Sequence, residues 1–441
     1  MSKPGKVYLA GAGPGDPGLL TRRAHELMHL CDVVCYDLLI DAAVLSLVPA
    51  GTTMIPVGYR GYCGTSIEYG MHPEVVEQAL TGRSVLRLKA GDPFIFGRAT
   101  EECRCLQHHG IDFEVVPGIS SALGAAAYAG FPLTSNGMAS DVTFASGHRA
   151  STTISNWAAM GQSSGTLVLY MGAKKLAEHA RELIEKGRDP RTPVAVIAAA
   201  TSHKQRMITA DLNEIGQCIA EFDNGDPMLV VMGQVVELSS ELDWRAALPL
   251  SGVQVLDCGG DATWVDSLRQ QGAVVVQAPR VELSYGLDEP GWQRLLAAKA
   301  LWLDSREAAQ SLYRLCLEQE LDCRHWHWQL AGTQQACDWM AQQGLFIRQM
   351  DSAASEALCI TKYDSSGLCL RQVHLVEPVY PLVQAAMVTV EEEQAFRYLV
   401  EQDLLNPDAL VFSGCERVRS EALRLGFRVN DSAQEGSRAA A

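Results

Sequence analysis

The sequence predicts an α/β protein with two successive domains. Short apolar segments alternate with helical patterns along both halves of the 441 residues, as in chains that build helix-covered sheets. Four times a helical segment ends in glycine and an apolar strand follows, at Gly110, Gly272, Gly344 and Gly426. Glycine adopts the left-handed backbone conformation at a helix end without steric cost, so the chain can turn into the next strand.

A polar stretch that contains proline and glycine, residues 239–252, divides the chain. It has no clear apolar period, and it follows a segment, Val230–Leu238, that we expect to be a strand. We therefore predict one domain over residues 1–245 and a second over residues 253–441. Each is long enough to bury its own core.

Composition and charge exclude several classes of function. The net charge of -16 makes a nucleic acid an improbable partner, because phosphate backbones attract basic surfaces. The apolar runs are too short to span a bilayer, and the first residues carry no export signal, so we expect a cytoplasmic protein. The 13 cysteines form no CxxC pair and no zinc-ligand spacing, so we expect reduced, mostly buried thiols and no metal.

A glycine-rich turn follows the first predicted strand, at residues 11–18. Such a turn before a helix suggests a nucleotide site. The dinucleotide fingerprint needs its third glycine at position 16, which is Asp16 here, and Pro14 removes a backbone donor that a phosphate would use. The turn therefore disfavours an NAD-dependent oxidoreductase.

Two further strand ends carry polar residues suited to a ligand. Residues 85–89 lead into Ala90, Gly91 and Asp92, where glycine permits close backbone approach and the carboxylate offers an acceptor. Arg98 and Glu101 follow at a spacing of three, so they share a face if this stretch is helical. The second strand end, at residues 115–122, carries Ser120 and Ser121, and serine at such a place is also a common helix cap.

Together the phrases of the first half carry a specific resemblance. Residues 6–245 resemble the tetrapyrrole methylase family, and within it they look most like uroporphyrinogen-III C-methyltransferases, which methylate ring carbons 2 and 7 to give precorrin-2. The matching phrases occur in the family's order: VYLAGAGPGDPGLLT, CDVVCYDLL, RLKAGDPFIFGR, EVVPGISSALGAAAYAGFPLT, TLVLYMG and TPVAVI.

The resemblance implies a two-lobed methylase domain that binds S-adenosylmethionine between its lobes and forms a homodimer. Because this methyl donor carries no phosphate, strand-end carbonyls and one carboxylate suit it better than a row of N–H donors. The residues that match the family's cofactor positions are Pro14, Ala90, Gly91, Asp92, Ile95, Ser120, Ser121, Met171, Ala195 and Ala200.

The resemblance also implies roles on the substrate side. Asp37 matches the proposed proton acceptor, and Arg98 and Glu101 match a pair that faces the carboxylate-rich uroporphyrinogen III. A basic pocket would need more cations, and the candidates are Arg60, Arg87 and Lys89. By the usual distribution of arginine and lysine, each of these three is more often a surface charge.

This chain departs from the family's pattern on the substrate side. Tyr59 stands where the family usually has a lysine that is its proposed proton donor, and Asn136 replaces a carboxylate-binding arginine. Three alternatives follow. The protein methylates uroporphyrinogen III with rearranged contacts, it methylates another tetrapyrrole, or it binds a tetrapyrrole without turnover.

The second half resembles uroporphyrinogen-III synthase, a two-lobed α/β enzyme. The phrases that carry this resemblance are strands that end before Ser305 and Ser413, together with residues 331–333 and 378–380. It implies one lobe from residues 253–283 plus 381–441 and a second lobe from residues 285–376. A bifunctional synthase and methyltransferase is one alternative, and a scaffold, regulatory or dimerising domain is another. Thr333 and Tyr380 are candidates there, with capping and core roles expected first.

Overall fold

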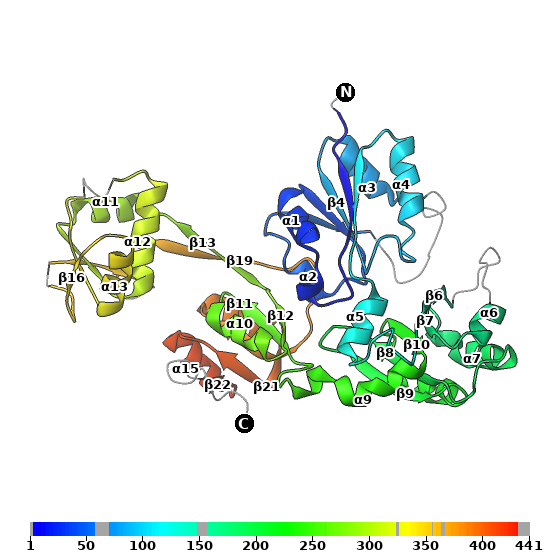
Figure 1. Ribbon diagram of the computed structural model, residues 1–441. Helices are drawn as coiled ribbons and strands as arrows, with labels where there is room; N and C mark the ends of the chain where they lie inside the picture. Colours follow the sequence, from blue (N-terminus) through cyan, green and yellow to red (C-terminus); the bar gives the residue numbers. More distant parts are fainter. Residues whose placement is uncertain are drawn as a thin grey trace. The chain divides into compact units, whose positions relative to one another are not determined.

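The computed structural model describes residues 3–57, 70–147, 157–260, 262–322, 326–354, 356–362 and 367–430. Strands and helices alternate along the described chain, which confirms the predicted α/β class (Figure 1). The chain divides into two compact units. One combines the residues up to Arg280 with those from Glu377 onward, and the other is Val281–Val376.

The first lobe is a parallel sheet of five strands in the order β3-β2-β4-β1-β5. Its strands are β1 (Val7–Gly11), β2 (Val33–Tyr36), β3 (Thr53–Pro56), β4 (Val85–Lys89) and β5 (Phe113–Val116). Its helices are α1 (Arg22–Leu30), α2 (Ala42–Leu45), α3 (Pro73–Leu80) and α4 (Ala99–His108), with a 3-10 turn η1 (Pro17–Leu19) after β1.

Helices cover both faces of this sheet. Residues of α1 and α2, such as Leu27 and Val44, pack with Leu86 and Leu88 of β4 in one cluster. Residues of α3 and α4 pack with Val85 in another. Because successive side chains of a strand point to opposite faces, even-numbered and odd-numbered positions of β4 serve different cores. All five strands are parallel, so the loops that follow them lie at one edge of the sheet.

The second lobe is a mixed sheet in the order β6-β7-β10-β8-β9, in which only the β6–β7 pair is parallel. Its strands are β6 (Val142–Ser146), β7 (Thr166–Tyr170), β8 (Pro193–Ala198), β9 (Arg206–Asp211) and β10 (Met228–Met232). Helix α5 (Ser121–Tyr128) packs on one face, and α6 (Trp157–Gln162), α7 (Leu176–Glu185) and α8 (Ile215–Phe222) pack on the other, with a 3-10 turn η2 (Ala173–Lys175) before α7.

A helical connector follows β10 where we predicted more strand. Within Val230–Leu238 only the residues up to Met232 are extended, so the prediction of a strand through Leu238 is wrong. Gly233 breaks the strand, and its backbone turns the chain into helix. The connector elements are η3 (Gln234–Leu238), α9 (Ser239–Leu242) and η4 (Trp244–Ala247).

The remaining residues build two more five-stranded parallel sheets. The first has the order β12-β11-β20-β21-β22, from β11 (Gln254–Cys258), β12 (Val274–Val276), β20 (Ala385–Val390), β21 (Leu405–Phe412) and β22 (Arg428–Asn430), with α10 (Ala262–Gln270), α14 (Glu393–Glu401) and α15 (Glu416–Arg424). The second has the order β16-β15-β14-β17-β18, from β14 (Ala300–Leu303), β15 (Gln329–Gly332), β16 (Arg348–Gln349), β17 (Leu358–Thr361) and β18 (Leu368–Cys369), with α11 (Glu289–Ala297), α12 (Arg306–Glu318) and α13 (Gln334–Gln342). Strands β13 (Arg280–Tyr285) and β19 (Arg371–Val376) pair in a two-stranded ribbon. In the sequence, β13 precedes the strands of the second sheet and β19 follows them.

The four helix-ending glycines behave as predicted. Gly110, Gly272, Gly344 and Gly426 all have positive φ, from 67° to 97°, and each stands between a helix and the next strand. Thr333 caps helix α13 by accepting a hydrogen bond from the Ala336 amide, as expected.

Candidate functional site

Three loops meet at the carboxyl edge of the first sheet. A Cβ atom added at Gly11 would lie 2.4 Å from the Gly91 oxygen and 2.5 Å from the Gly118 Cα, so the backbones that follow β1, β4 and β5 are in direct contact. Gly13 and Gly91 also pair with each other, through amide-to-carbonyl hydrogen bonds of 3.2 and 2.8 Å. Glycine is required here because only a residue without a side chain allows these backbones to touch.

Asp92 fastens the loop after β4. One carboxylate oxygen accepts from the amides of Phe94 and Ile95, at 2.8 and 3.2 Å. The other accepts from the Gly118 amide, at 3.0 Å. The sequence predicted Asp92 as an acceptor for a ligand, whereas these contacts make it a brace between the loops after β4 and β5. Ala90 and Gly91 contribute backbone to the same edge.

Asp37 stands at the end of β2 in a buried network of charges. Its Oδ1 lies 2.6 Å from the Arg87 guanidinium, and its Oδ2 accepts from the Ala90 amide at 3.3 Å. Arg87 also reaches Glu102 Oε1 at 3.2 Å, and Lys89 Nζ lies 2.7 Å from Glu102 Oε2. The side chains of Arg87, Lys89 and Glu102 are each 6% exposed, against 21% for Asp37, so Asp37 is the member that solvent reaches.

The network keeps Asp37 ionised. Burial alone would raise the pKa of Asp37, but the charges of Arg87 and Lys89 and the hydrogen bonds from Arg87 and Ala90 outweigh it and lower the pKa. For Lys89, burial lowers the pKa, and the positive charge of Arg87 lowers it further. A carboxylate that is charged, oriented and still accessible is suited to accept a proton.

The expectation that Arg87 and Lys89 are surface charges is wrong. Both are buried, because a parallel sheet with helices on both faces leaves no exposed face for a strand residue. They share with Val85 the face that α4 covers, where Glu102 provides their counter-charge. Strand alternation, with a glutamate in the next helix, is the sequence signal that could have found this network.

Arg98 and Glu101 lie at the start of α4. Arg98 precedes the first helical residue and has a left-handed backbone, with φ of 57°. Its Nε lies 3.8 Å from Glu101 Oε1, and the two side chains are 39% and 46% exposed. An exposed pair at this distance adds little stability.

The glycine-rich turn after β1 reaches the second lobe. A Cβ at Gly15 would lie 3.0 Å from the Ala200 oxygen, and the Pro14 ring packs on Gly124 of α5. Asp16 donates its amide to the Thr201 hydroxyl at 2.9 Å. The structure therefore brings the turn that carries Pro14 against the second-lobe loop that carries Ala200.

Ser120, which precedes α5, bonds a residue that the sequence analysis left without a role. The Ser120 hydroxyl lies 2.5 Å from the hydroxyl of Tyr170, the last residue of β7, and that oxygen also accepts from the Ala122 amide at 3.1 Å. The Phe96 ring packs on Tyr170, with centroids 4.8 Å apart. The phrase TLVLYMG was one of the motifs of the first half, and its tyrosine, Tyr170, is the residue that could have been singled out from the sequence.

Replacing Tyr170 with phenylalanine should destabilise the protein by about 2 kcal/mol, because the buried Ser120 hydroxyl and the Ala122 amide lose a shared partner. Urea denaturation followed by circular dichroism measures the change. Tyr8→Phe is the control, since the contacts of its ring with Lys6 and Arg23 do not need the hydroxyl. Equal midpoints for the two variants would contradict this role of Tyr170.

Apolar and strained residues gather around the same loops. The side chains of Ile95 and Met171 are 36% and 57% exposed. Ser121 is the first residue of helix α5. Among the described residues seven non-glycine residues have positive φ, and five of them lie in loops that follow β4, β7 and β8: Phe96, Arg98, Met171, Ala199 and Thr201. Strained backbone of this kind clusters at functional sites.

One predicted cofactor residue, Ala195, is not brought to this edge. Ala195 lies inside β8, fully buried between Val231 and Thr209 on the neighbouring strands. Tyr59 falls outside the described residues, as does Arg60.

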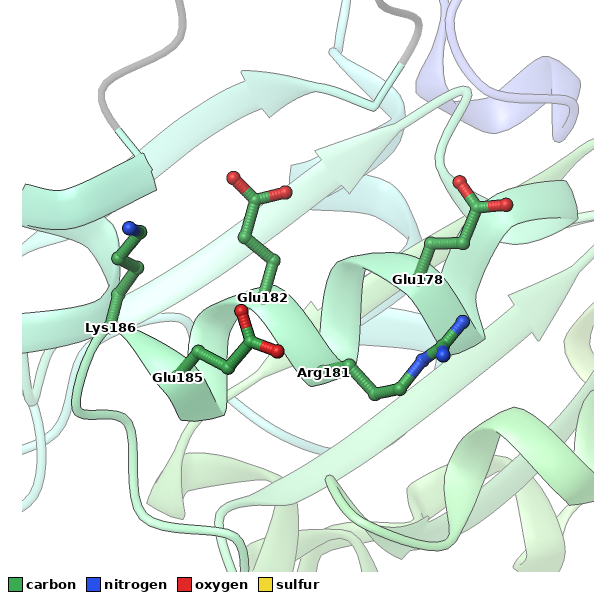
Figure 2. Close-up of a pocket in the computed structure, with 5 residues that line it drawn as sticks. All are labelled: Glu178, Arg181, Glu182, Glu185 and Lys186. Atoms are coloured by element: carbon green, nitrogen blue, oxygen red, sulfur yellow. The ribbon is translucent and has the colours of Figure 1, made fainter.

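A shallow hollow elsewhere on the second lobe carries only charged side chains of helix α7 (Figure 2). It is lined by Glu178, Arg181, Glu182 and Glu185 of α7 and by Lys186, and Figure 2 shows the first four on the helix and Lys186 just after its end. Within the ranges that the structure describes, no group of three or more metal-binding side chains comes together. None of the helices in those ranges combines the length and apolarity needed to cross a bilayer.

Known proteins share the first half of the chain. Residues 6–216 match the model of the family described as Tetrapyrrole (Corrin/Porphyrin) Methylases. A solved structure, the native uroporphyrin III C-methyl transferase from Thermus thermophilus, is 36% identical, and the match covers 53% of this chain and 94% of that one, with a TM-score of 0.46. The chain belongs to the tetrapyrrole methylase family. The family match confirms the tetrapyrrole methylase resemblance of the first half.

Curated relatives match more than half of the chain. The siroheme synthase of Chromobacterium violaceum is 43% identical over 252 residues, which are 57% of this chain and 54% of that protein. The siroheme synthase of Pseudomonas fluorescens strain SBW25 is 45% identical over 242 residues, 55% of this chain and 52% of that protein. The chain spans about half the length of these relatives. A second Thermus thermophilus structure, 36% identical and covered completely, is complexed with S-adenosyl homocysteine.

The side chains and backbone of these loops are chemically compatible with S-adenosylmethionine. The exposed side chains of Ile95 and Met171 are apolar, which suits an adenosine and the methylene groups of methionine. A Cβ at Gly91 would meet only the Ser121 amide, at 3.8 Å, so the backbone at Gly91 faces open space. The start of α5 at Ser121 suits a carboxylate. The family's description as methylases supports the predicted enzyme class, and the chemistry of these loops is compatible with the predicted methyl donor.

Proposed function

We propose that this protein methylates uroporphyrinogen III at ring carbons 2 and 7 and yields precorrin-2, with S-adenosylmethionine as the donor. The observation that carries the proposal is the environment of Asp37, an ionised and accessible carboxylate at the edge where the cofactor loops meet. The donor, when bound, supplies a methyl group activated by a sulfonium. Asp37 then accepts the proton that the macrocycle loses, and catalysis is otherwise positioning.

Arg98 and Glu101 are proposed to hold the substrate. The exposed guanidinium of Arg98 offers donors to a propionate or acetate group, and Glu101 orients it across 3.8 Å. Exposed apolar side chains at Leu38 and Phe94 provide surface for a flat macrocycle. Tyr59, outside the described residues, keeps its proposed role as a hydrogen-bond donor in place of the family's lysine.

The second half is proposed to be a uroporphyrinogen-III synthase-like domain. The observation in favour is the path of the chain: β11 and β12 share a sheet with β20–β22, while the residues between them build a separate sheet. A synthase in the same chain would supply the substrate of the methylase at a raised local concentration. We further propose that the protein is cytoplasmic and forms a homodimer.

Anaerobic incubation with uroporphyrinogen III and labelled S-adenosylmethionine tests the main proposal. We expect mass spectrometry to show two methyl groups added to each product molecule. Transfer to a different tetrapyrrole alone would replace the substrate in this proposal. Binding of the donor without transfer to any tetrapyrrole would show that the site only binds.

A further inference from the structure

The helical connector that follows β10 is packed on the methylase helix α5. The Trp244 indole donates to the Ala127 carbonyl at 2.9 Å, and its ring meets the Tyr128 ring edge-on, with centroids 5.5 Å apart. The Arg245 guanidinium lies over the same Tyr128 ring, 5.0 Å from its centroid, and Arg245 is only 8% exposed. A Cβ at Gly130 would come within 2.6 Å of the Asp243 Cα, so the two backbones touch. The contacts place Tyr128 between the connector and the protein interior.

Tyr128 in turn joins a closed ring of hydrogen bonds. Its hydroxyl donates to Asp16 Oδ2 at 2.8 Å, and Asp16 donates its amide to the Thr201 hydroxyl at 2.9 Å. Thr201 donates its amide to the Gln205 side chain at 2.6 Å, and Gln205 donates back to the Tyr128 carbonyl at 2.9 Å. Burial and the Asp16 carboxylate raise the pKa of Tyr128, so its hydroxyl remains a donor.

This ring ties together the loops of both lobes. Asp16 lies in the glycine-rich turn two residues after Pro14, and Thr201 follows Ala200 directly, so two predicted cofactor residues are close in sequence to members of the ring. Thr201 is fully buried and has a left-handed backbone, with φ of 63°. Such a conformation persists only where surrounding contacts hold it. Loss of the ring would release both loops at the point where the lobes meet.

We propose that Tyr128, held in place by Trp244 and Arg245 of the connector, is a positioning residue that sets the affinity of the methylase for S-adenosylmethionine. The proposal rests on the proposed function of the same site. It makes the connector a working part of the methylase domain, although the family match ends at residue 216. Tyr128 acts through the loops and does not take part in methyl transfer itself.

The test uses the full chain and calorimetric titration with S-adenosylhomocysteine. In Tyr128→Phe we expect Kd to rise roughly tenfold, because a hydrogen bond to a carboxylate is lost while the ring remains. KM for S-adenosylmethionine should rise by a similar factor, with kcat and KM for the tetrapyrrole little changed. Trp244→Phe, which keeps an aromatic ring and removes the indole donor, should raise Kd by roughly threefold. Tyr313→Phe, in the other compact unit, is the matched control and should leave Kd unchanged.

An unchanged Kd in Tyr128→Phe would overturn this proposal, and so would a fall in kcat without a change in Kd. If circular dichroism shows that Tyr128→Phe does not fold, Trp244→Phe decides, and an unchanged Kd there overturns the proposal. Failure of the unmodified protein to bind S-adenosylhomocysteine would instead refute the proposed function, which keeps the two failures distinct.

Discussion

Replacement of Arg87 by methionine should lower the rate of methyl transfer at least hundredfold, about what is lost when a general base no longer works. Arg87 is the group that holds both Asp37 and Glu102, at 2.6 and 3.2 Å. Without Arg87, the carboxylates of Asp37 and Glu102 repel each other, and Lys89 is the cation of this network that remains. We expect the free energy of unfolding to fall by about 4 kcal/mol, as when one partner of a buried ion pair is removed.

The pH profile separates this effect from simple loss of structure. The folded-state pKa of Asp37 lies below its ordinary value, so its ionised form stabilises the fold above the unfolded-state pKa. That contribution is lost as pH falls through the lowered folded-state pKa. In Arg87→Met the pKa of Asp37 rises, so the acid limb of the rate profile should move to higher pH.

Arg83→Met is the control for Arg87→Met. Arg83 lies just before the start of β4, where it bonds the Thr53 hydroxyl and the Gln78 side chain away from the site. Its replacement should leave the position of the acid limb unchanged. An Arg87→Met protein that folds and keeps the acid limb of the parent would refute the role of Arg87 in holding Asp37 ionised.

Replacement of Gly118 by alanine should separate the three loops at the carboxyl edge. The added Cβ would lie 2.3 Å from the Gly91 oxygen and 2.7 Å from the Gly11 Cα, and these are backbone atoms that cannot rotate away. We expect a loss of about 3 kcal/mol in stability, the upper end of what overpacking costs. Displacement of the loops by about 1 Å should lower the rate of methyl transfer roughly hundredfold, and S-adenosylhomocysteine should bind more weakly.

Gly286→Ala is the matched control for Gly118→Ala. A Cβ at Gly286 would meet no atom within 4 Å, so the same chemical change is made without a clash. Urea denaturation and calorimetric titration of both variants measure the effects. Unimpaired binding by a folded Gly118→Ala protein would show that the close approach of the loops is not needed for the cofactor.

In the second lobe, the pattern of apolar residues predicted neither which strands pair nor where β10 ends. The apolar run at β10 predicted a strand, but nothing in it indicated that β10 pairs antiparallel with both β7 and β8. The prediction of a strand through Leu238 failed for the same reason, since apolar residues of the 3-10 turn Gln234–Leu238 also face the core. Apolar runs report burial, and a short helix buries them as well as a strand does.

The sequence by itself determined the fold class, the helix-ending glycines and the strand-end loops that form the site. Each of these depends on neighbours within a few residues, because backbone conformation and the apolar period are local properties. Only the tertiary structure decided that Arg87 pairs with Asp37, 50 residues earlier, and that Tyr128 bonds Asp16, 112 residues earlier. Such pairs depend on strand order, which places β4 beside β2, and on register, which places Arg87 opposite Cys35. Whether a charge is buried and paired is therefore settled by packing between distant segments, and no local pattern contains that information.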